Sequence, residues 1–281
     1  MDKDYLGRLN SATKYPSIDT YHKIDPRTGR LLPELSGPIQ QCPVIMTEKV
    51  NGTNGRIILQ PDGDWFIGSR EEILYAKGDR IENPQLSIVP ALLPLAERIG
   101  GLPRSPKEAG STWVFFLEVY GHRIGPAAKQ YTTSGLVHYR MFDVAEVDRE
   151  VLTWEREQIS GWREHGGQSF ANEDGLQAMA AMADIPLVPR LGEVAGDQLP
   201  VKLEDMQQFL ADHLKYTGVA LDEGAAYGKP EGLVLRTRNR SPIYKARFED
   251  YQRTLAPPQK NRRKPPPGAT NIWDPAESVE P

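Results

Sequence analysis

The chain has 281 residues, of which 39% are hydrophobic, so it is long enough to bury the core of one large domain or two small ones. No run of about 18 apolar residues occurs, and this excludes a membrane-spanning helix. The single cysteine, Cys42, excludes a disulfide framework and fits a reducing compartment, so we expect a cytoplasmic protein.

The net charge of −4 argues weakly against a nucleic-acid partner, but the charge is unevenly distributed. Residues 229–264 contain eleven Lys or Arg and three acids, a charge of +8, whereas residues 265–281 carry three acids and no base. Residues 1–228 therefore carry −9. This asymmetry favours a basic surface for a polyanion, although a solvated charged face followed by a tail explains it equally well.

The order of the predicted elements is that of an α+β domain. The first forty residues are polar, with turns at Pro26 and Gly29, and we expect them to lie along the domain edge. Residues 61–64, Pro-Asp-Gly-Asp, predict a hairpin between two strands. The predicted strands are Val44–Lys49, Arg56–Gln60, Trp65–Ser69, Thr112–Tyr120, Val137–Val144, Gly232–Thr237 and Ile243–Arg247.

Helical apolar spacing occurs in three segments, Leu86–Ile99, Asn172–Ala183 and Leu203–Leu214. Prolines at 90 and 94 predict that the first of these helices is broken. Beyond Leu255 the chain is rich in proline and charge and has little to bury. We therefore expect a domain over residues 1–255 and a Pro-rich, partly basic flexible tail over residues 256–281.

A lysine in a glycine-rich turn is the first candidate for chemistry. Lys49 ends a predicted strand and is followed by Gly52 and Gly55, which let a backbone approach a phosphate or a base closely. Taken alone, an exposed lysine in a hairpin turn explains this pattern better. The turn is not a Walker loop, because no Gly-Lys-Ser or Gly-Lys-Thr occurs.

Acids and aromatic residues on the later strands add to this lysine. Glu118 and Glu231 each lie at the end of an apolar strand, where a carboxylate needs a partner such as a ribose hydroxyl or a backbone N–H. On the strand over residues 137–144, Tyr139 and Phe142 compete as the residue that stacks on a base, and core packing is the common alternative for both.

Two cations share one face of the last predicted strand. The period of two places Lys245 and Arg247 on the same side. Like charges so close together are unfavourable unless an anion or a carboxylate neutralises them. The pattern therefore favours a phosphate or an acidic side chain beside this strand.

The order of these short blocks resembles the covalent nucleotidyltransferase superfamily of RNA ligases, DNA ligases and mRNA capping enzymes. That superfamily has a Lys-x-x-Gly motif followed by four or five short blocks, and the resemblance here spans Thr47 to Arg247. The blocks are, in order, Lys49–Gly52, Gly68–Arg70, Glu118–Gly121, Tyr139–Asp143, Glu231–Arg236 and Lys245–Arg247.

Within the superfamily, residues 48–54, Glu-Lys-Val-Asn-Gly-Thr-Asn, are most similar to RNA ligase 2 and the RNA-editing ligases. DNA ligases and capping enzymes usually have Lys-x-Asp-Gly-x-Arg, where this chain has Asn51 and Asn54. Arg236 and Arg247 depart from the branch, which usually has lysine at both positions. Arginine keeps the charge but cannot present it as a compact point charge.

The resemblance implies an ATP-grasp-like nucleotidyltransferase domain of antiparallel sheets flanked by helices, and an ATP-dependent RNA ligase. In that mechanism Lys49 attacks the α-phosphate of ATP, the adenylate moves to a 5′-phosphate of RNA, and a 3′-hydroxyl expels AMP. Magnesium, or manganese, is the implied metal. Lys245, Arg247 and the metal would disfavour the protonated form of Lys49 and stabilise charge on the α-phosphate.

By the same resemblance, Arg70 and Glu118 hold the ribose region, Phe142 stacks on adenine, and Glu231 places the metal or its waters. Tyr139 remains the competing stacking residue. The residues implied to bind ATP or to support its site are Glu48, Asn54, Arg70, Glu118, Phe142, Asp143, Glu231, Lys245 and Arg247.

Three other functions remain open at this point: a capping-type guanylyltransferase, a DNA ligase, and an inactive nucleic-acid-binding module. The implied RNA is a nicked duplex or a broken structured RNA. Phe248–Pro281 is too short for the C-terminal domain that family members usually add, which leaves room for an accessory protein. The basic cluster Lys260–Lys264 is expected to contact nucleic acid in its place.

Overall fold

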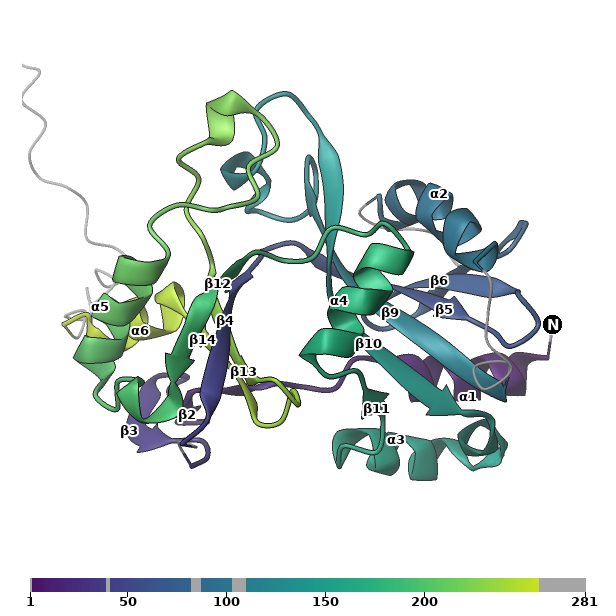
Figure 1. Cartoon of the computed structure of the whole chain (residues 1–281), viewed down its shortest axis with the longest axis horizontal. Coiled ribbons are helices and arrows are strands. Elements are labelled where there is room, and N and C mark those ends of the chain that lie inside the picture. Colours follow the sequence, from purple (N-terminus) through teal and green to yellow (C-terminus); the bar gives the residue numbers. More distant parts are fainter. Residues whose placement is uncertain (1, 39–40, 82–86, 103–109, 258–281) are drawn as a thin grey trace, which may run out of the picture.

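The computed structural model describes residues 2–38, 41–81, 87–102 and 110–257. Two β-sheets form the middle of the protein, and helices cover them (Figure 1). Each neighbouring pair of described strands is antiparallel, except the short parallel pair β1 and β14. The α+β class and its antiparallel sheets are therefore confirmed.

The smaller of the two main sheets has five strands in the order β1-β14-β13-β4-β12. Their bounds are β1 Asp19–Thr20, β4 Pro43–Lys49, β12 Arg190–Ala195, β13 Gly232–Thr237 and β14 Ile243–Arg247. Strands β13 and β14 begin and end at the predicted residues. A separate two-stranded sheet pairs β2, His22–Ile24, with β3, Leu31–Leu35.

The larger sheet has seven strands in the order β11-β10-β9-β5-β6-β7-β8. Their bounds are β5 Thr53–Leu59, β6 Trp65–Ser69, β7 Ile73–Ala76, β8 Asp79–Arg80, β9 Ser111–Gly121, β10 Val137–Asp148 and β11 Ser169–Phe170. The predicted hairpin is β5 with β6, and the two long predicted strands are β9 and β10.

Alternation along the strands of the larger sheet sends side chains to two separate cores. Ile57 and Phe115 pack on one face with α2, whereas Ile58 and Phe116 pack on the other face with α1 and α3. The helices that pack on the two faces of the larger sheet are α1 Lys3–Thr13, α2 Ile88–Gly100, α3 Arg156–Glu164 and α4 Glu173–Met182.

The five-stranded sheet buries one face only. Leu233 and Leu235 of β13 pack there against Met206 and Leu210 of α5, Leu203–His213, and α6, Phe248–Leu255, lies in the same cluster. The other face is left to line a cavity. Short 3₁₀ turns span 128–130, 149–153, 196–198 and 223–225. No helix in the described part of the chain is long and apolar enough to cross a membrane.

The prediction of a broken helix over Leu86–Ile99 is wrong. Helix α2 is continuous, although Leu86 lies outside the described residues. Pro90 lies in the first turn, where the backbone N–H has no acceptor within the helix. Pro94 removes one bond, but burial of the apolar face against β5 and β6 outweighs that loss.

The polar N-terminal segment contains a helix that the sequence did not predict. Asp2 caps α1 by accepting a hydrogen bond from the backbone N–H of Asp4, and Leu9 and Ala12 are fully buried. Tyr5, Leu6, Leu9 and Ala12 share one face of α1 and pack into one core, so the helical spacing is present but the polar composition of the segment masked it. The predicted tail lies almost entirely outside the described residues, which end at position 257.

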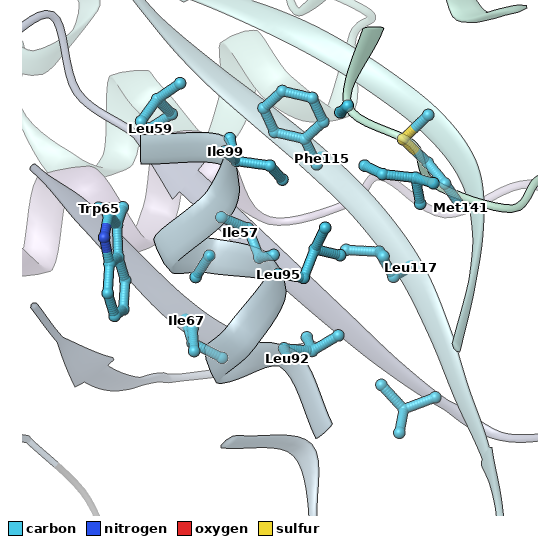
Figure 2. Close-up of a cluster of buried hydrophobic side chains, with 14 of the residues drawn as sticks. Ile57, Leu59, Trp65, Ile67, Leu92, Leu95, Ile99, Phe115, Leu117 and Met141 are labelled. Carbon is cyan, nitrogen blue, oxygen red and sulfur yellow. The ribbon is translucent and has the colours of Figure 1, made fainter. Parts of the chain in front are cut away.

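Leu92 gives a test of the α2 core. Figure 2 shows Leu92, Leu95 and Ile99 of α2 among Ile57 and Leu117 of the sheet, and Leu92 is fully buried. Leu92→Ala leaves a cavity there, so we expect it to lower the free energy of unfolding by about 2–5 kcal/mol in a denaturant titration. Met182→Ala, at an exposed position, is the control and should cost less than about 0.5 kcal/mol.

Candidate active site

A cavity of about 430 Å³ lies between the two sheets. Strands β4, β13 and β14 form one wall, and residues from β5, β9 and β10 form the other. Nine of the ten predicted site residues line it, all except Asp143. They are Glu48, Lys49, Asn54, Arg70, Glu118, Phe142, Glu231, Lys245 and Arg247.

Strand alternation places the charged residues of the five-stranded sheet in this cavity. Arg236 of β13 and Lys245 and Arg247 of β14 line it, whereas Leu235 and Ala246 lie in the core on the opposite face. The predicted common face of Lys245 and Arg247 therefore exists, and it faces the cavity.

An ion pair joins Lys49 to Glu231 at the end of β4. The register pairs Lys49 with Gly232 across β4 and β13, so Glu231 lies next to the lysine. The Lys49 Nζ is 2.6 Å from the Glu231 Oε2, and 27% of the lysine side chain is exposed. This contact fixes the amine in the cavity while leaving part of it accessible.

The turn after Lys49 is fixed against β9. The backbone N–H of Gly52 donates to the Glu118 Oε1 at 3.0 Å, and that of Asn51 donates to the Tyr131 hydroxyl at 2.7 Å. A Cβ at position 52 would lie 2.2 Å from the carbonyl oxygen of Val119, so only glycine fits. The backbone that follows Lys49 is therefore held in one conformation by contacts with β9 and Tyr131.

Burial is the main cause that raises the pKa of Glu118 to about 7; the charge of Lys49 opposes the rise, and the nearby Glu231 carboxylate adds to it. Near neutral pH this carboxyl is thus divided between a form that donates a hydrogen bond and a form that only accepts. Both forms suit a ribose hydroxyl, which can donate or accept.

Asn54 offers a second polar atom to a ligand. Its side-chain oxygen is buried and has no hydrogen-bond partner among the described residues, although the residue lines the cavity. A buried acceptor without a partner is costly, so a ligand hydroxyl or amine at this point would be favoured.

A cluster of cations forms the opposite side of the cavity. The pKa of Lys245 is lowered by its burial and then by the charges of Arg247, Lys49 and Arg70. The Asp250 carboxylate holds Arg247 through two contacts, 2.7 and 3.0 Å from its Nε and Nη2. This concentration of positive charge fits the phosphates of a nucleotide.

Glu48 is occupied by protein groups. Its carboxylate accepts hydrogen bonds from the Thr217 hydroxyl and from the backbone N–H of Gly218, the latter at 2.8 Å. Burial raises its pKa, and these two donors oppose the shift. The contacts attach the end of β4 to the segment that follows α5.

Of the two candidates for stacking, Phe142 lines the cavity and Tyr139 does not. A bulge in β10 at residues 141–143 interrupts the alternation, and Phe142 lies with its ring 5.0 Å from that of Tyr15, perpendicular to it. Tyr139 instead stacks on His138 and packs at the edge of the α2 core.

Asp143 lies behind the cavity wall rather than in it. Its carboxylate accepts from the Tyr15 hydroxyl at 2.9 Å and from the Arg240 Nε at 2.6 Å, and Arg236 is 3.5 Å away. The residue thus connects the larger sheet to the N-terminal segment and to β13. Its geometry is that of a support for Phe142 and Tyr15.

Sequence reasoning missed several residues that complete the site. Tyr15 lines the cavity, Tyr131 and Thr217 hold the turn and Glu48, and Asp250 holds Arg247. For Tyr15, Tyr131 and Thr217 the partners are at least 80 positions away, so no local pattern identifies them. Asp250 is three residues from Arg247, and this spacing at a helix start was a readable signal.

Within the described residues, no group of three or more His, Cys, Asp or Glu is arranged to hold a metal ion. Magnesium commonly uses only one or two carboxylates and takes its other ligands from substrate phosphates and water. Glu231, near the cations that fit those phosphates, matches that requirement. The donor set therefore fits a metal that arrives with the nucleotide.

A comparison with known protein families identifies the family of this chain. The family model described as RNA ligase matches residues 42–248, a range that contains all ten predicted site residues. This chain belongs to the RNA ligase family. No curated protein matches it.

Solved structures of Naegleria gruberi RNA ligase share the fold. The structure with PPi is 14% identical, with a TM-score of 0.50, and the match covers 77% of this chain and 52% of that one. A glutamate-to-alanine mutant with AMP and Mn is 13% identical, with a TM-score of 0.53 and coverage of 86% and 58%. A second such mutant, with ATP and Mn, is 13% identical, with a TM-score of 0.51, and the match covers 88% of this chain and 62% of that one. The chain spans about half the length of the first of these structures.

The raised pKa of Glu118 predicts how stability depends on pH. Between pH 4.5 and about 7 the folded state keeps a proton that the unfolded state releases, so the free energy of unfolding falls as pH rises. Glu118→Gln removes this titration. The free energy of unfolding of the variant, minus that of the parent, should rise by on the order of 3 kcal/mol from pH 4.5 to about 7. Above pH 7 this difference should stay constant. Denaturant unfolding at each pH measures it. Parallel profiles would show that the pKa of Glu118 is not raised in the folded state.

Proposed function

We propose that this member of the RNA ligase family is an ATP-dependent RNA ligase that joins 3′-hydroxyl and 5′-phosphate ends. The observation that carries the proposal is the position of the Lys49 amine, paired with Glu231 and facing the cations Lys245 and Arg247. A nucleophile beside a phosphate site is the arrangement that nucleotidyl transfer requires.

The first step forms a covalent adenylate. The Lys49 amine, after loss of a proton, attacks the α-phosphorus of ATP; a P–N bond forms, the bond to the β-phosphate oxygen breaks, and pyrophosphate leaves. Lys245 and Arg247 stabilise the charge that develops on the α-phosphate. Because Asp250 orients Arg247, its guanidinium is held in place before the nucleotide arrives.

The second and third steps transfer and release AMP. A 5′-phosphate oxygen of RNA attacks the α-phosphorus of the lysyl adenylate, which breaks the P–N bond and restores the amine. The 3′-hydroxyl of the other end then attacks the activated 5′-phosphorus, forms the new phosphodiester and expels AMP. The same cations serve each step, because charge develops on the same phosphate groups.

The remaining site residues bind and orient the nucleotide. Phe142 stacks on adenine, Glu118, Arg70 and Asn54 contact the ribose region, and Glu48 and Asp143 act as supports through their protein contacts. Glu231 helps to hold magnesium or manganese, which supplies charge neutralisation at the phosphates. Related Naegleria structures were solved with ATP and Mn and with AMP and Mn, which supports this choice of nucleotide and metal.

The proposed substrate is a nicked duplex or broken structured RNA, joined in a reducing compartment such as the cytoplasm. The single cysteine fits that compartment. We also propose that an accessory protein or the basic cluster Lys260–Lys264, which lies outside the described residues, adds contacts to the RNA.

Lys49 provides the direct test. With labelled ATP and magnesium, the parent should retain label on the protein after denaturation, and Lys49→Ala should retain none because the nucleophile is gone. Lys77→Ala is the matched control, since Lys77 is exposed and paired with Asp64 away from the cavity. Equal labelling of Lys49→Ala would refute the lysyl adenylate.

The same assay separates the alternatives. Labelling from GTP rather than ATP would favour a capping-type guanylyltransferase, and preferred sealing of nicked DNA would favour a DNA ligase. Absence of any covalent nucleotide would favour a nucleic-acid-binding module.

Phe142 and Tyr139 give a second test, of nucleotide binding. Phe142→Leu keeps apolar bulk but removes the aromatic plane, so the Kd for ATP should rise at least about fivefold, the lower end of base stacking on aromatic rings. Tyr139→Leu should change it less than about twofold. A larger effect from the Tyr139 variant would reverse the assignment. Both Kd values are measured by calorimetry in the Lys49→Ala background, which prevents turnover.

A further inference from the structure

Two loops project together from the middle of the protein, and we call them the tyrosine lobe. They are residues 122–136, between β9 and β10, and residues 215–229, between α5 and β13. In Figure 1 they lie side by side at the top of the view, one teal and one light green. The backbone N–H of Leu221 donates to the carbonyl of Tyr131 at 2.7 Å, which joins the two loops.

The lobe is built as a rigid unit. The Asp222 carboxylate in one loop accepts hydrogen bonds from the Thr132 hydroxyl at 2.7 Å and from the backbone N–H of Thr133 at 2.8 Å in the other. At Gly228 the loops approach so closely that a Cβ would lie 1.8 Å from the carbonyl oxygen of Gln130. The backbone that carries the side chains of this lobe is therefore held in place.

Two tyrosines stand out from its surface. Tyr227 is 77% exposed and Tyr216 is 43% exposed, and their rings meet edge to face with centroids 5.1 Å apart. Among the described residues, Tyr227 is the most exposed large hydrophobic side chain. An exposed aromatic pair on a rigid support contributes little to the core, whereas its open ring faces suit stacking with a flat partner.

Basic residues flank both tyrosines. The Lys215 Nζ lies 5.4 Å from the centre of the Tyr216 ring, and the exposed Lys229 is two residues from Tyr227. Of the two acids in the second loop, Asp222 is hydrogen-bonded to the first loop and Glu223 is exposed. Aromatic rings beside lysines match a partner that has flat bases and a negative backbone.

The lobe is attached directly to the ends of β4 and β13 that border the cavity. Thr217, next to Tyr216, donates its hydroxyl to Glu48, and the Thr217 N–H donates to the Gly228 carbonyl at 2.9 Å. Glu231 lies four residues after Tyr227, so their Cα atoms are at most about 14 Å apart. An RNA end bound beside Glu231 would therefore place its first few nucleotides near the tyrosines.

We propose that Tyr216 and Tyr227 form a stacking platform for unpaired RNA nucleotides a few positions from the ends being joined, with Lys215 and Lys229 contacting the phosphates. This proposal rests on the proposed function for the identity of the nucleic acid. The bases stack on the open ring faces, and because every base has such a face, the platform is tolerant of sequence.

The experiment measures binding of a fluorescent 5′-phosphorylated single-stranded RNA by anisotropy, with the Lys49→Ala protein as the parent. Replacing both tyrosines by alanine should raise the Kd at least about tenfold at moderate salt, because two stacking contacts are lost. The matched control replaces Val201 and Met182, exposed apolar side chains outside the lobe, by alanine and should stay within about twofold. Lys215→Ala with Lys229→Ala should reduce the salt dependence of binding.

A second arm locates the bound base. Abasic positions are placed one at a time from the 5′-phosphate inward. At one or two of them the loss of the base should weaken binding to the parent but not to the tyrosine double variant. If a base missing at any position weakens both proteins equally, or if the double variant binds within about twofold of the parent, the platform is refuted and a protein partner for this surface is favoured.

Formation of lysyl-AMP, with Lys49 restored, separates this result from the proposed function. The tyrosine double variant should label as the native chain does, which also shows that it is folded. If it does not, Tyr227→Ala alone is measured and judged by a threshold of about fivefold for its one contact. A native chain that never labels refutes the proposed function, whereas normal labelling with unchanged RNA affinity refutes only the platform.

Discussion

The ion pair between Lys49 and Glu231 depends on the antiparallel register of β4 and β13. Lys49 pairs with Gly232, and Gly232 itself pairs with Arg247 of β14, so three neighbouring strands bring an amine, a carboxylate and a guanidinium together at their ends. A Cβ at position 232 would lie 2.1 Å from the carbonyl oxygen of Ala246. Glycine at this point therefore permits the close strand approach on which the ion pair depends. A slip of one residue would turn these side chains to the opposite face.

The cations of the site are stabilised in the free protein by specific carboxylates. Asp250 holds Arg247, Asp143 lies 3.5 Å from Arg236, and Glu231 holds Lys49. Lys245 has no ion pair among the described residues, and its lowered pKa reflects burial beside other positive groups. A phosphate that enters the cavity would relieve this repulsion. Part of the affinity for a nucleotide is thus built into the unfavourable electrostatics of the empty arrangement.

How much of this was readable from the sequence depends on the range of each interaction. Strands β13 and β14 and the common face of Lys245 and Arg247 follow from local alternation, and these features were predicted. The order of the motifs indicated the family before any geometry was known. By contrast, Tyr15 reaches Asp143 across 128 positions, and Thr217 reaches Glu48 across 169. Their roles arise only when the two sheets pack together.

Helix α2 shows the second limit of local reasoning. Its two prolines indicate a break, yet tertiary burial of its apolar face keeps it continuous. The bulge at Phe142 is similar, because strict alternation does not indicate which neighbouring side chain reaches the cavity. At both places packing between distant segments decides the outcome.

The tyrosine lobe is linked to the segment around Lys49 by two contacts, one through Glu48 and one through the Asn51 N–H, which donates to the Tyr131 hydroxyl. Glu48 directly precedes Lys49 on β4, and its carboxylate is held by Thr217, the neighbour of Tyr216. An RNA strand stacked on the lobe would therefore lie at a fixed distance from the adenylate, with no flexible linker between the two sites. In the proposed mechanism, holding both reactants on one support would reduce the entropy lost when a 5′-phosphate meets the lysyl adenylate. On the proposed function, the buried carboxylate of Glu48 would connect the RNA-binding surface to the turn that carries Lys49.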